Sequence, residues 1–150
     1  MSDVYSLVFQ PGKSEYKPPY RYNRVPIELA NLIADHGIEG DRKAGRNPKR
    51  QINIMSYEML ELLRAEGFKT DPGQMGEQII VRGIDVETLQ RRDRLQLGER
   101  AVVEVNFLRE PCPWVEQVQH KTMAEAEGRI GILVSVIEGG LVRHGDCVQV

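Results

Sequence analysis

The chain has 150 residues, of which 41% are hydrophobic and 28% are charged, and this composition excludes a disordered chain. Lysine and arginine number 20 against 22 acidic residues, so the net charge of -2 gives no general attraction to nucleic acid or anionic lipid. We therefore expect one domain over residues 1–150, with no nucleic-acid partner and no membrane partner.

The N-terminal residues lack the basic and apolar regions of a signal peptide, and no apolar run has the length of a membrane helix. We expect a cytoplasmic protein on these grounds. In that compartment Cys112 and Cys147 are expected to be free thiols rather than a disulfide.

Residues 4–9 form a short, apolar, β-prone run that predicts a first strand, closed by a turn at Pro11 and Gly12. Residues 13–24 mix three tyrosines with prolines and basic residues, which is typical of an extended surface loop. Residues 25–34 are apolar enough to be buried, but their spacing leaves both a strand and a short helix open.

Residues 51–55 alternate, with Ile52 and Ile54 on one side, and Ser56 is a favoured residue for the start of a helix that Gly67 ends. The second half contains short β segments separated by glycine turns, at residues 78–81, 94–97, 101–108, 130–137 and 147–150. This pattern indicates a closed sheet or a sandwich in which helices are insertions. Within 101–108 the alternation predicts that Val103, Val105 and Phe107 share the buried face.

The segment from Arg109 to Trp114 follows the best-defined of these strands and precedes an expected short helix at residues 114–120. Pro113 suits the first helical position, which would make Cys112 the N-cap. Backbone N–H groups at a helix start, together with the nearby Arg109, would favour the reactive thiolate form. The alternative is that Cys112 is a buried packing residue, the role that we expect for Cys147. The flanking prolines favour the reactive interpretation, because they fix a rigid strand-to-helix corner.

Residues 41–50 concentrate basic side chains in a chain that is otherwise slightly acidic: Arg42, Lys43, Arg46, Lys49 and Arg50. The planar guanidinium suits bidentate contact with phosphate, so a phosphorylated small molecule is one candidate ligand. The alternative is a solvated charged loop.

Glu77 and Gln78 follow two glycines and could read the hydrogen-bonding edge of a heterocycle. His36, His120 and His144 lack the mutual spacing of metal ligands, so no zinc site is expected.

Taken in order, four short motifs resemble the MOSC domain, a family related to the C-terminal part of molybdenum cofactor sulfurases. They are the Gly-Ile-Glu-Gly-Asp-Arg run at 37–42, Gly-Glu-Gln at 76–78, Arg-x-Pro-Cys at 109–112, and the Gly-Gly and Gly-Asp pairs at 139–140 and 145–146. The resemblance runs from about residue 25 to the C-terminus. It implies a mainly β fold, a closed, mostly antiparallel β-barrel with a few short helices, and a cleft that contains Cys112.

The resemblance also implies a function for Cys112: either it carries sulfur as a persulfide, or it ligates the metal of the molybdenum cofactor (molybdopterin). The expected enzyme classes are a sulfur transferase and a molybdenum-cofactor-dependent reductase of N-hydroxylated compounds. The implied partners are a pyridoxal-phosphate-dependent cysteine desulfurase, which would hold the pyridoxal phosphate, and an electron-transfer protein.

Side chains expected to bind the cofactor are Asp41, Arg42, Arg46, Arg50, Glu77, Gln78 and Arg109. Two positions depart from the family pattern. The family usually has Glu-Asn where this chain has Glu77 and Gln78, and a Gly-Asp pair where this chain has Arg92 and Asp93.

Two other functions compete with cofactor handling. One is a non-catalytic β-barrel binding module that presents the tyrosines of residues 16–22 and the basic loop to a protein or nucleic acid partner. The other is a thiol redox sensor in which Cys147 resolves an oxidised Cys112.

Overall fold

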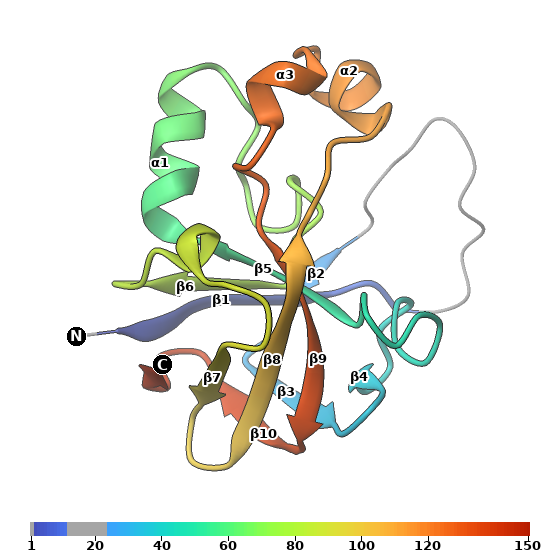
Figure 1. Cartoon of the computed structure of the whole chain (residues 1–150), viewed down its shortest axis with the longest axis vertical. Coiled ribbons are helices and arrows are strands. Elements are labelled where there is room, and N and C mark those ends of the chain that lie inside the picture. The colour runs from blue at the N-terminus through green and yellow to red at the C-terminus, as the bar shows by residue number, and fades with distance from the viewer. Residues whose placement is uncertain (1, 12–23) are drawn as a thin grey trace.

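The computed structural model describes residues 2–11 and 24–150, which form two sheets and a few short helices (Figure 1). The strands of the larger sheet are β1 (Asp3–Phe9), β2 (Val25–Pro26), β5 (Ile52–Ser56), β6 (Ile79–Arg82), β7 (Arg94–Leu97), β8 (Ala101–Leu108), β9 (Ile132–Glu138) and β11 (Val148–Gln149). The smaller sheet holds β3 (Leu29–Ile33), β4 (Gly37–Ile38) and β10 (Gly140–Arg143). The helices are α1 (Tyr57–Ala65), the 3-10 turn η1 (Val86–Thr88), α2 (Trp114–Gln119) and α3 (Met123–Ala126).

The mainly β composition with short helices agrees with the prediction, but the closed, mostly antiparallel β-barrel is wrong. Among the described residues the larger sheet runs β11-β7-β8-β9-β5-β6-β1-β2 and the smaller one β10-β3-β4, and neither closes on itself. The two edge strands of the larger sheet, β11 and β2, have two residues each, and the β11 end reaches β1 only through an isolated bridge between Asp3 and Cys147 rather than through a ladder. The larger sheet is also mixed, because α1 connects β5 to a parallel neighbour, β6.

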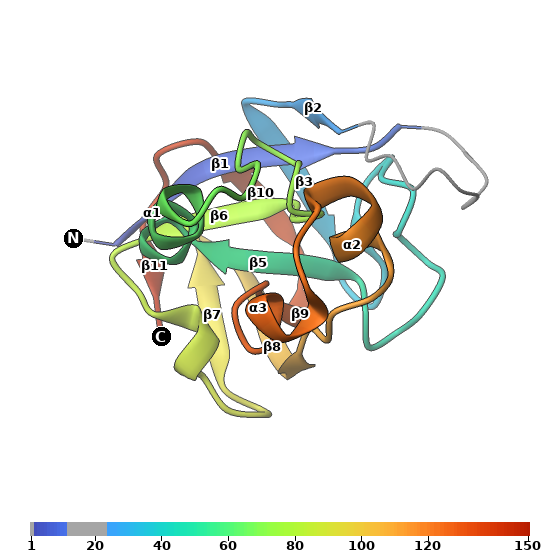
Figure 2. The same cartoon turned by 90° about the horizontal axis from the view of Figure 1, so that it is seen from above.

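The apolar residues are divided between two cores, with β5 between them. Ile52 and Ile54 belong to the core between the two sheets, whereas Met55 packs beneath the helices with Leu63 and Trp114. Figure 1 shows α1, α2 and α3 gathered at one end of the molecule, away from the smaller sheet, and Figure 2 views the molecule from that end. The predicted alternation of β5 is therefore confirmed, and every residue of this strand is buried because both of its faces are covered.

Several other expectations from the sequence are confirmed. Ser56 is the N-cap of α1, where its hydroxyl accepts a hydrogen bond from the Met59 N–H at 3.2 Å. The first strand and the later β segments are present within one or two residues of their predicted bounds. Residues 25–34, which the sequence left open, form β2 and β3 rather than a helix.

The prediction for Phe107 is wrong, and the reason is a local irregularity in β8. Val103 and Val105 are buried as expected, but Phe107 is exposed. The pairing of β8 with β9 shifts register between Val105 and Phe107, and such a bulge turns the following side chains to a new direction. This register shift lies just before Arg109. It therefore sets the direction in which the chain leaves β8 toward Arg109 and Cys112.

No helix in the described parts of the chain is long and apolar enough to cross a membrane.

Candidate functional site

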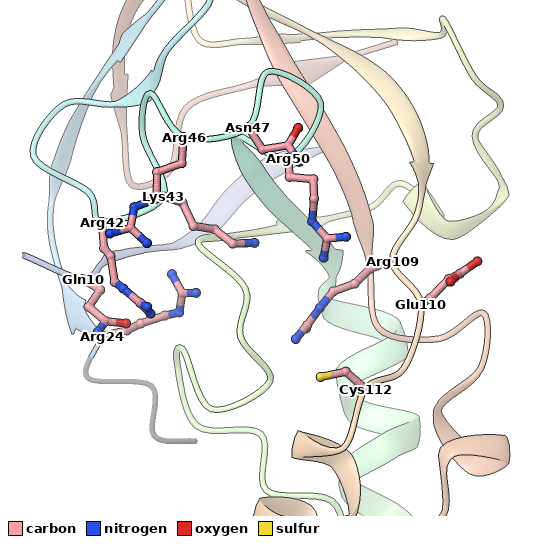
Figure 3. Close-up of a pocket in the computed structure, with 10 residues that line it drawn as sticks. All are labelled: Gln10, Arg24, Arg42, Lys43, Arg46, Asn47, Arg50, Arg109, Glu110 and Cys112. Carbon is pink, nitrogen blue, oxygen red and sulfur yellow. The ribbon is translucent and has the colours of Figure 1, made fainter. Parts of the chain in front are cut away.

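A cavity of about 390 Å³ lies where three separate segments of the chain meet (Figure 3). The segments are the end of β1 with the start of β2, the loop from β4 to β5, and the link from β8 to α2. The described residues that line it are Gln10, Arg24, Arg42, Lys43, Arg46, Asn47, Arg50, Arg109, Glu110 and Cys112. They are six basic side chains, two amides, one carboxylate and one thiol, so the wall is strongly cationic.

Asp41 fixes the first part of the β4–β5 loop against the larger sheet. Its buried carboxylate accepts hydrogen bonds from the Gln10 N–H at 2.8 Å and from Nε2 of Gln78 at 3.2 Å. It also lies 4.0 Å from the guanidinium of Arg24. Asp41 and Gln78 therefore lie behind the cavity wall and hold it, whereas the sequence had predicted that both would bind the ligand.

The second part of the same loop is attached to β8 and β9. Asn106 donates hydrogen bonds from Nδ2 to the Lys49 carbonyl and to Oγ of Ser135, both at 2.8 Å, and Ser135 donates to the Pro48 carbonyl. The guanidinium of Arg50 lies 5.9 Å from the centre of the Phe107 ring, which the bulge in β8 has turned outward. These contacts hold Arg50 at the rim of the cavity, where its side chain stays exposed.

Arg109 is a buried arginine at the end of β8. Its guanidinium donates to the Met75 carbonyl and lies 5.0 Å from the centre of the Trp114 ring. The Met75 loop is in turn held by Glu77, which accepts from the N–H groups of Gly73 at 2.7 Å and Met75 at 3.1 Å. Burial raises the pKa of Glu77, and these two hydrogen bonds oppose that rise. Glu77 thus supports Arg109 through the loop and does not line the cavity.

Gly73 allows that loop to pass close to Arg24. Its φ is 85°, and a Cβ atom at this position would lie 2.6 Å from Cβ of Arg24. Only glycine accepts both the backbone angle and the close approach. The turn at Gly73 therefore packs against Arg24, one of the arginines that line the cavity.

Cys112 lies between the cationic wall and the helical end of the molecule. Its side chain is half-buried, packs partly against the core beneath the helices, and points toward the cavity in Figure 3. The prediction that it is the N-cap of α2 is wrong by one residue: Pro113 is the N-cap, with helical φ and ψ of -52° and -22°, and the helix begins at Trp114. Because α2 has only six residues, the charges that surround Cys112 come from the arginines and Lys43 rather than from a long helix.

Lys43 points into the middle of the cavity (Figure 3). Burial, followed by the positive charges of Arg109, Arg24 and Arg50, lowers its pKa to about 7, while Asp41 opposes this shift. The ordinary lysine pKa is 10.5, so at pH 7 about half of the Lys43 side chains are neutral.

Cys147 has a different setting, and the expectation that it packs in a buried strand is wrong. It is exposed and pairs with Asp3 in an isolated bridge at the start of β1, far from the helical end where Cys112 lies. Both thiols are free. A redox sensor that joins Cys112 to Cys147 would require these distant regions to meet.

The structure therefore brings together five of the predicted site residues, namely Arg42, Arg46, Arg50, Arg109 and Cys112. It adds Gln10, Arg24, Lys43, Asn47 and Glu110. Lys43 and Asn47 lie inside the basic loop that the sequence singled out, and Glu110 adjoins Arg109. No motif in the sequence around Gln10 or Arg24 indicates a binding residue. The fold of the N-terminal segment places them at the cavity.

Among residues 2–11 and 24–150, no group of three or more histidine, cysteine, aspartate or glutamate side chains is arranged to hold a metal ion. The tyrosines at 16, 20 and 22, on which the binding-module hypothesis depends, lie outside the described residues.

Known protein structures share this architecture. Solved structures with the same fold include the YuaD protein from Bacillus subtilis, with a TM-score of 0.79, 20% identity, and coverage of 99% of this chain and 94% of that chain. YiiM from Geobacillus stearothermophilus matches with a TM-score of 0.73 and 18% identity over 99% of this chain and 74% of that one. YiiM from Escherichia coli matches with a TM-score of 0.65 and 21% identity over 99% and 67%.

No curated protein matches the chain in sequence. The family profile described as the MOSC domain does match it, over residues 41–149, which include the cationic loop, Arg109 and Cys112. The chain therefore belongs to the MOSC domain family.

Proposed function

We propose that the cavity binds the molybdenum cofactor, with Cys112 as the ligand to molybdenum and the surrounding arginines as partners of the cofactor's phosphate. The observation that carries this proposal is that the thiol and six basic side chains line one cavity. A thiol alone, or a cationic loop alone, would not indicate which class of ligand the cavity binds.

The donor set fits the cofactor. A cysteine thiolate is a soft ligand of the kind that thiophilic metals prefer, and arginine forks match the oxygens of a phosphate. The volume of about 390 Å³ falls within the range of small-molecule sites, roughly 300–1,000 Å³. Carriage of sulfur as a persulfide adds one atom to Cys112, for which neither this volume nor this number of cations is needed.

Each group has a separate task in this proposal. Arg42, Arg46 and Arg50 would bind the phosphate, and Arg109 would contribute positive charge beside Cys112. Asp41, Glu77 and Gln78 act as positioning residues through the contacts that hold the cavity wall. The cofactor, when bound, supplies the redox-active metal, and the protein binds and orients it. An electron-transfer protein is the partner that this function implies.

The test is to express the chain in cells that make the molybdenum cofactor, purify it, and measure molybdenum and pterin per protein. We expect both in near-stoichiometric amounts in the wild type and in the Cys147→Ser variant. The Cys112→Ser variant should lose molybdenum. The absence of both molybdenum and pterin from the wild type would refute the proposal.

The same preparation distinguishes sulfur carriage. Incubation with cysteine and a pyridoxal-phosphate-dependent cysteine desulfurase, followed by mass spectrometry, would detect one added sulfur on Cys112. Sulfur loading without molybdenum or pterin would replace cofactor binding with a persulfide carrier.

A further inference from the structure

The six basic side chains of the cavity differ in one chemical respect. Five of them, Arg24, Arg42, Arg46, Arg50 and Arg109, are guanidinium groups, which stay protonated in proteins. Lys43 is the one member of this described set that can release a proton. Among the basic side chains of the cavity, a change of charge near neutral pH can therefore occur only at Lys43.

The position of Lys43 makes that adjustment favourable. Its side chain extends from the β4–β5 loop into the middle of the cavity, with Arg42 and Arg24 on one side and Arg50 and Arg109 on the other (Figure 3). Charged and titratable groups reach this space from every side: Arg24 before β2, Asp41, Arg42, Arg46 and Arg50 on the same loop, and Arg109, Glu110 and Cys112 after β8. The carboxylate of Asp41 is already engaged by the Gln10 N–H, Gln78 and Arg24.

We propose that the cavity binds its anionic ligand together with a proton, and that Lys43 is the group that takes up this proton. The inference rests on the proposed function in one respect, namely that the ligand is an anion held by these cations. Without the ligand, like charges around Lys43 favour its neutral form. An anion in the cavity reverses the sign of the local field and favours the ammonium. Lowering of the pKa of Lys43 to about 7 by burial and by Arg109, Arg24 and Arg50 agrees with this account.

The consequence is that the ligand and pH control each other. Above pH 7 the unliganded cavity has five positive side chains in place of six, and binding restores the sixth by removing a proton from the solvent. Affinity for a dianion should fall as pH rises from 6.5 to 8.5, by up to about 25-fold if only the protonated form of Lys43 binds well. A cavity whose basic residues were all arginine would show no such dependence.

Sulfate is the appropriate probe, because it is a dianion that does not titrate in this pH range. Calorimetric titration with sulfate at pH 8, in two buffers of different ionisation enthalpy, gives the number of protons taken up per anion bound. With a free pKa of about 7, we expect uptake of up to about 0.9 proton in the wild type. Sulfate binding without proton uptake, or no sulfate binding at all, would overturn the inference.

The matched variants are Lys43→Arg and Lys49→Arg, which replace two lysines of the same loop. Lys43→Arg keeps the positive charge but removes the titration, so it should bind sulfate without proton uptake and with an affinity that is constant from pH 6.5 to 8.5. Lys49 is exposed and does not line the cavity, so Lys49→Arg should behave as the wild type. Proton uptake that persists in Lys43→Arg would assign it to another group and refute the role of Lys43.

A direct measurement avoids reliance on variants. Carbon-13 labelling of the lysine side chains allows each ε-carbon to be followed by NMR as the pH changes. One resonance, absent from Lys43→Arg, should titrate near pH 7 and move to a higher pH when sulfate is added. If every lysine titrated near pH 10 without sulfate, the inference would be wrong.

This result is independent of cofactor loading. Proton-coupled sulfate binding in a protein that never acquires molybdenum or pterin would retain the inference and reject the proposed cofactor. If the protein acquired molybdenum and pterin but bound sulfate without taking up a proton, the proposed cofactor would be retained and the inference about Lys43 rejected.

Discussion

Basic side chains on the outer surface and basic side chains in the cavity have opposite surroundings. On the surface, each of three arginines has its own carboxylate: Arg82 with Asp3 at 2.7 Å, Arg94 with Glu104 at 3.1 Å, and Arg129 with Glu66. In the cavity, six basic residues gather around one lining carboxylate among the described residues, that of Glu110. The chain therefore has a strongly positive site although its net charge is -2.

The difference separates what these charges do. Exposed ion pairs contribute little to stability, because water screens them and ordering long side chains costs entropy. A cluster of like charges disfavours the folded state until an anion joins it, so its presence points to ligand binding rather than to stability. Four predictions test this contrast.

The largest effect should come from reversing one cavity charge. Arg42→Glu removes a donor and places a carboxylate among the remaining cations, so sulfate affinity should fall by roughly 10- to 150-fold, the value of a charged hydrogen bond. The measurement is calorimetric titration, with Arg91→Glu as the control, because Arg91 is exposed and does not line the cavity. Equal losses in both variants would mean that sulfate responds only to overall charge.

A second effect concerns the pH dependence of stability at Lys43. Because its pKa is lowered in the folded state, the unfolded chain binds the extra proton between about pH 7 and the ordinary lysine value of 10.5. Stability of the wild type should therefore rise with pH through this window. Lys43→Gln should be more stable than the wild type at pH 6, with a difference that shrinks toward pH 10.

Urea unfolding at several pH values measures this difference, and Lys49→Gln provides the control from the same loop. A gain in Lys43→Gln that stayed constant from pH 6 to 10 would show that the burial of the Lys43 charge and its repulsion by the arginines are not the cause.

A smaller effect is expected where the cationic loop is attached to the sheet. Asn106→Ala removes the hydrogen bonds to Lys49 and Ser135, at a cost of about 1–2 kcal/mol in unfolding free energy. Sulfate affinity should also fall several-fold, because Arg46 and Arg50 lose their fixed position. Asn31→Ala removes a comparable side-chain hydrogen bond, to Glu39, away from the cavity, and should leave sulfate affinity unchanged. Wild-type affinity in Asn106→Ala would show that this attachment does not order the cavity.

The smallest effect should come from a surface pair. Arg94→Ala removes the contact with Glu104, for which we expect a loss of at most about 1 kcal/mol in thermal or urea unfolding. Sulfate binding should not change. A weaker sulfate affinity in this variant would extend the anion site beyond the cavity and weaken the contrast between the two regions.

The sequence predicted local elements well and their assembly poorly. The Ser56 cap, the alternation of β5 and the short β segments depend on neighbouring residues, and these agree with the structure. The predicted closure failed because it depends on which strands pair at long range. One available signal was the strand–helix–strand order of β5, α1 and β6, which favours a parallel pair and therefore a mixed sheet.

The same division applies to the site. Motifs that are contiguous in sequence, the basic loop and the Arg109-to-Cys112 corner, identified five lining residues. Glu77, Gln78 and Asp41 were predicted to bind the cofactor, but in the fold their hydrogen bonds are made to other protein groups. Arg24 was not among the predicted site residues, because its place depends on the pairing of β2 with β1.

The central claim is that Cys112 and the cationic cluster form one site, and protection from alkylation tests it most directly. The protein is treated with iodoacetamide, with and without saturating pyrophosphate, and the modification of each cysteine is followed by mass spectrometry. We predict that pyrophosphate slows the modification of Cys112 several-fold and leaves the exposed Cys147 unaffected. Equal rates at Cys112 with and without the anion would contradict a shared site.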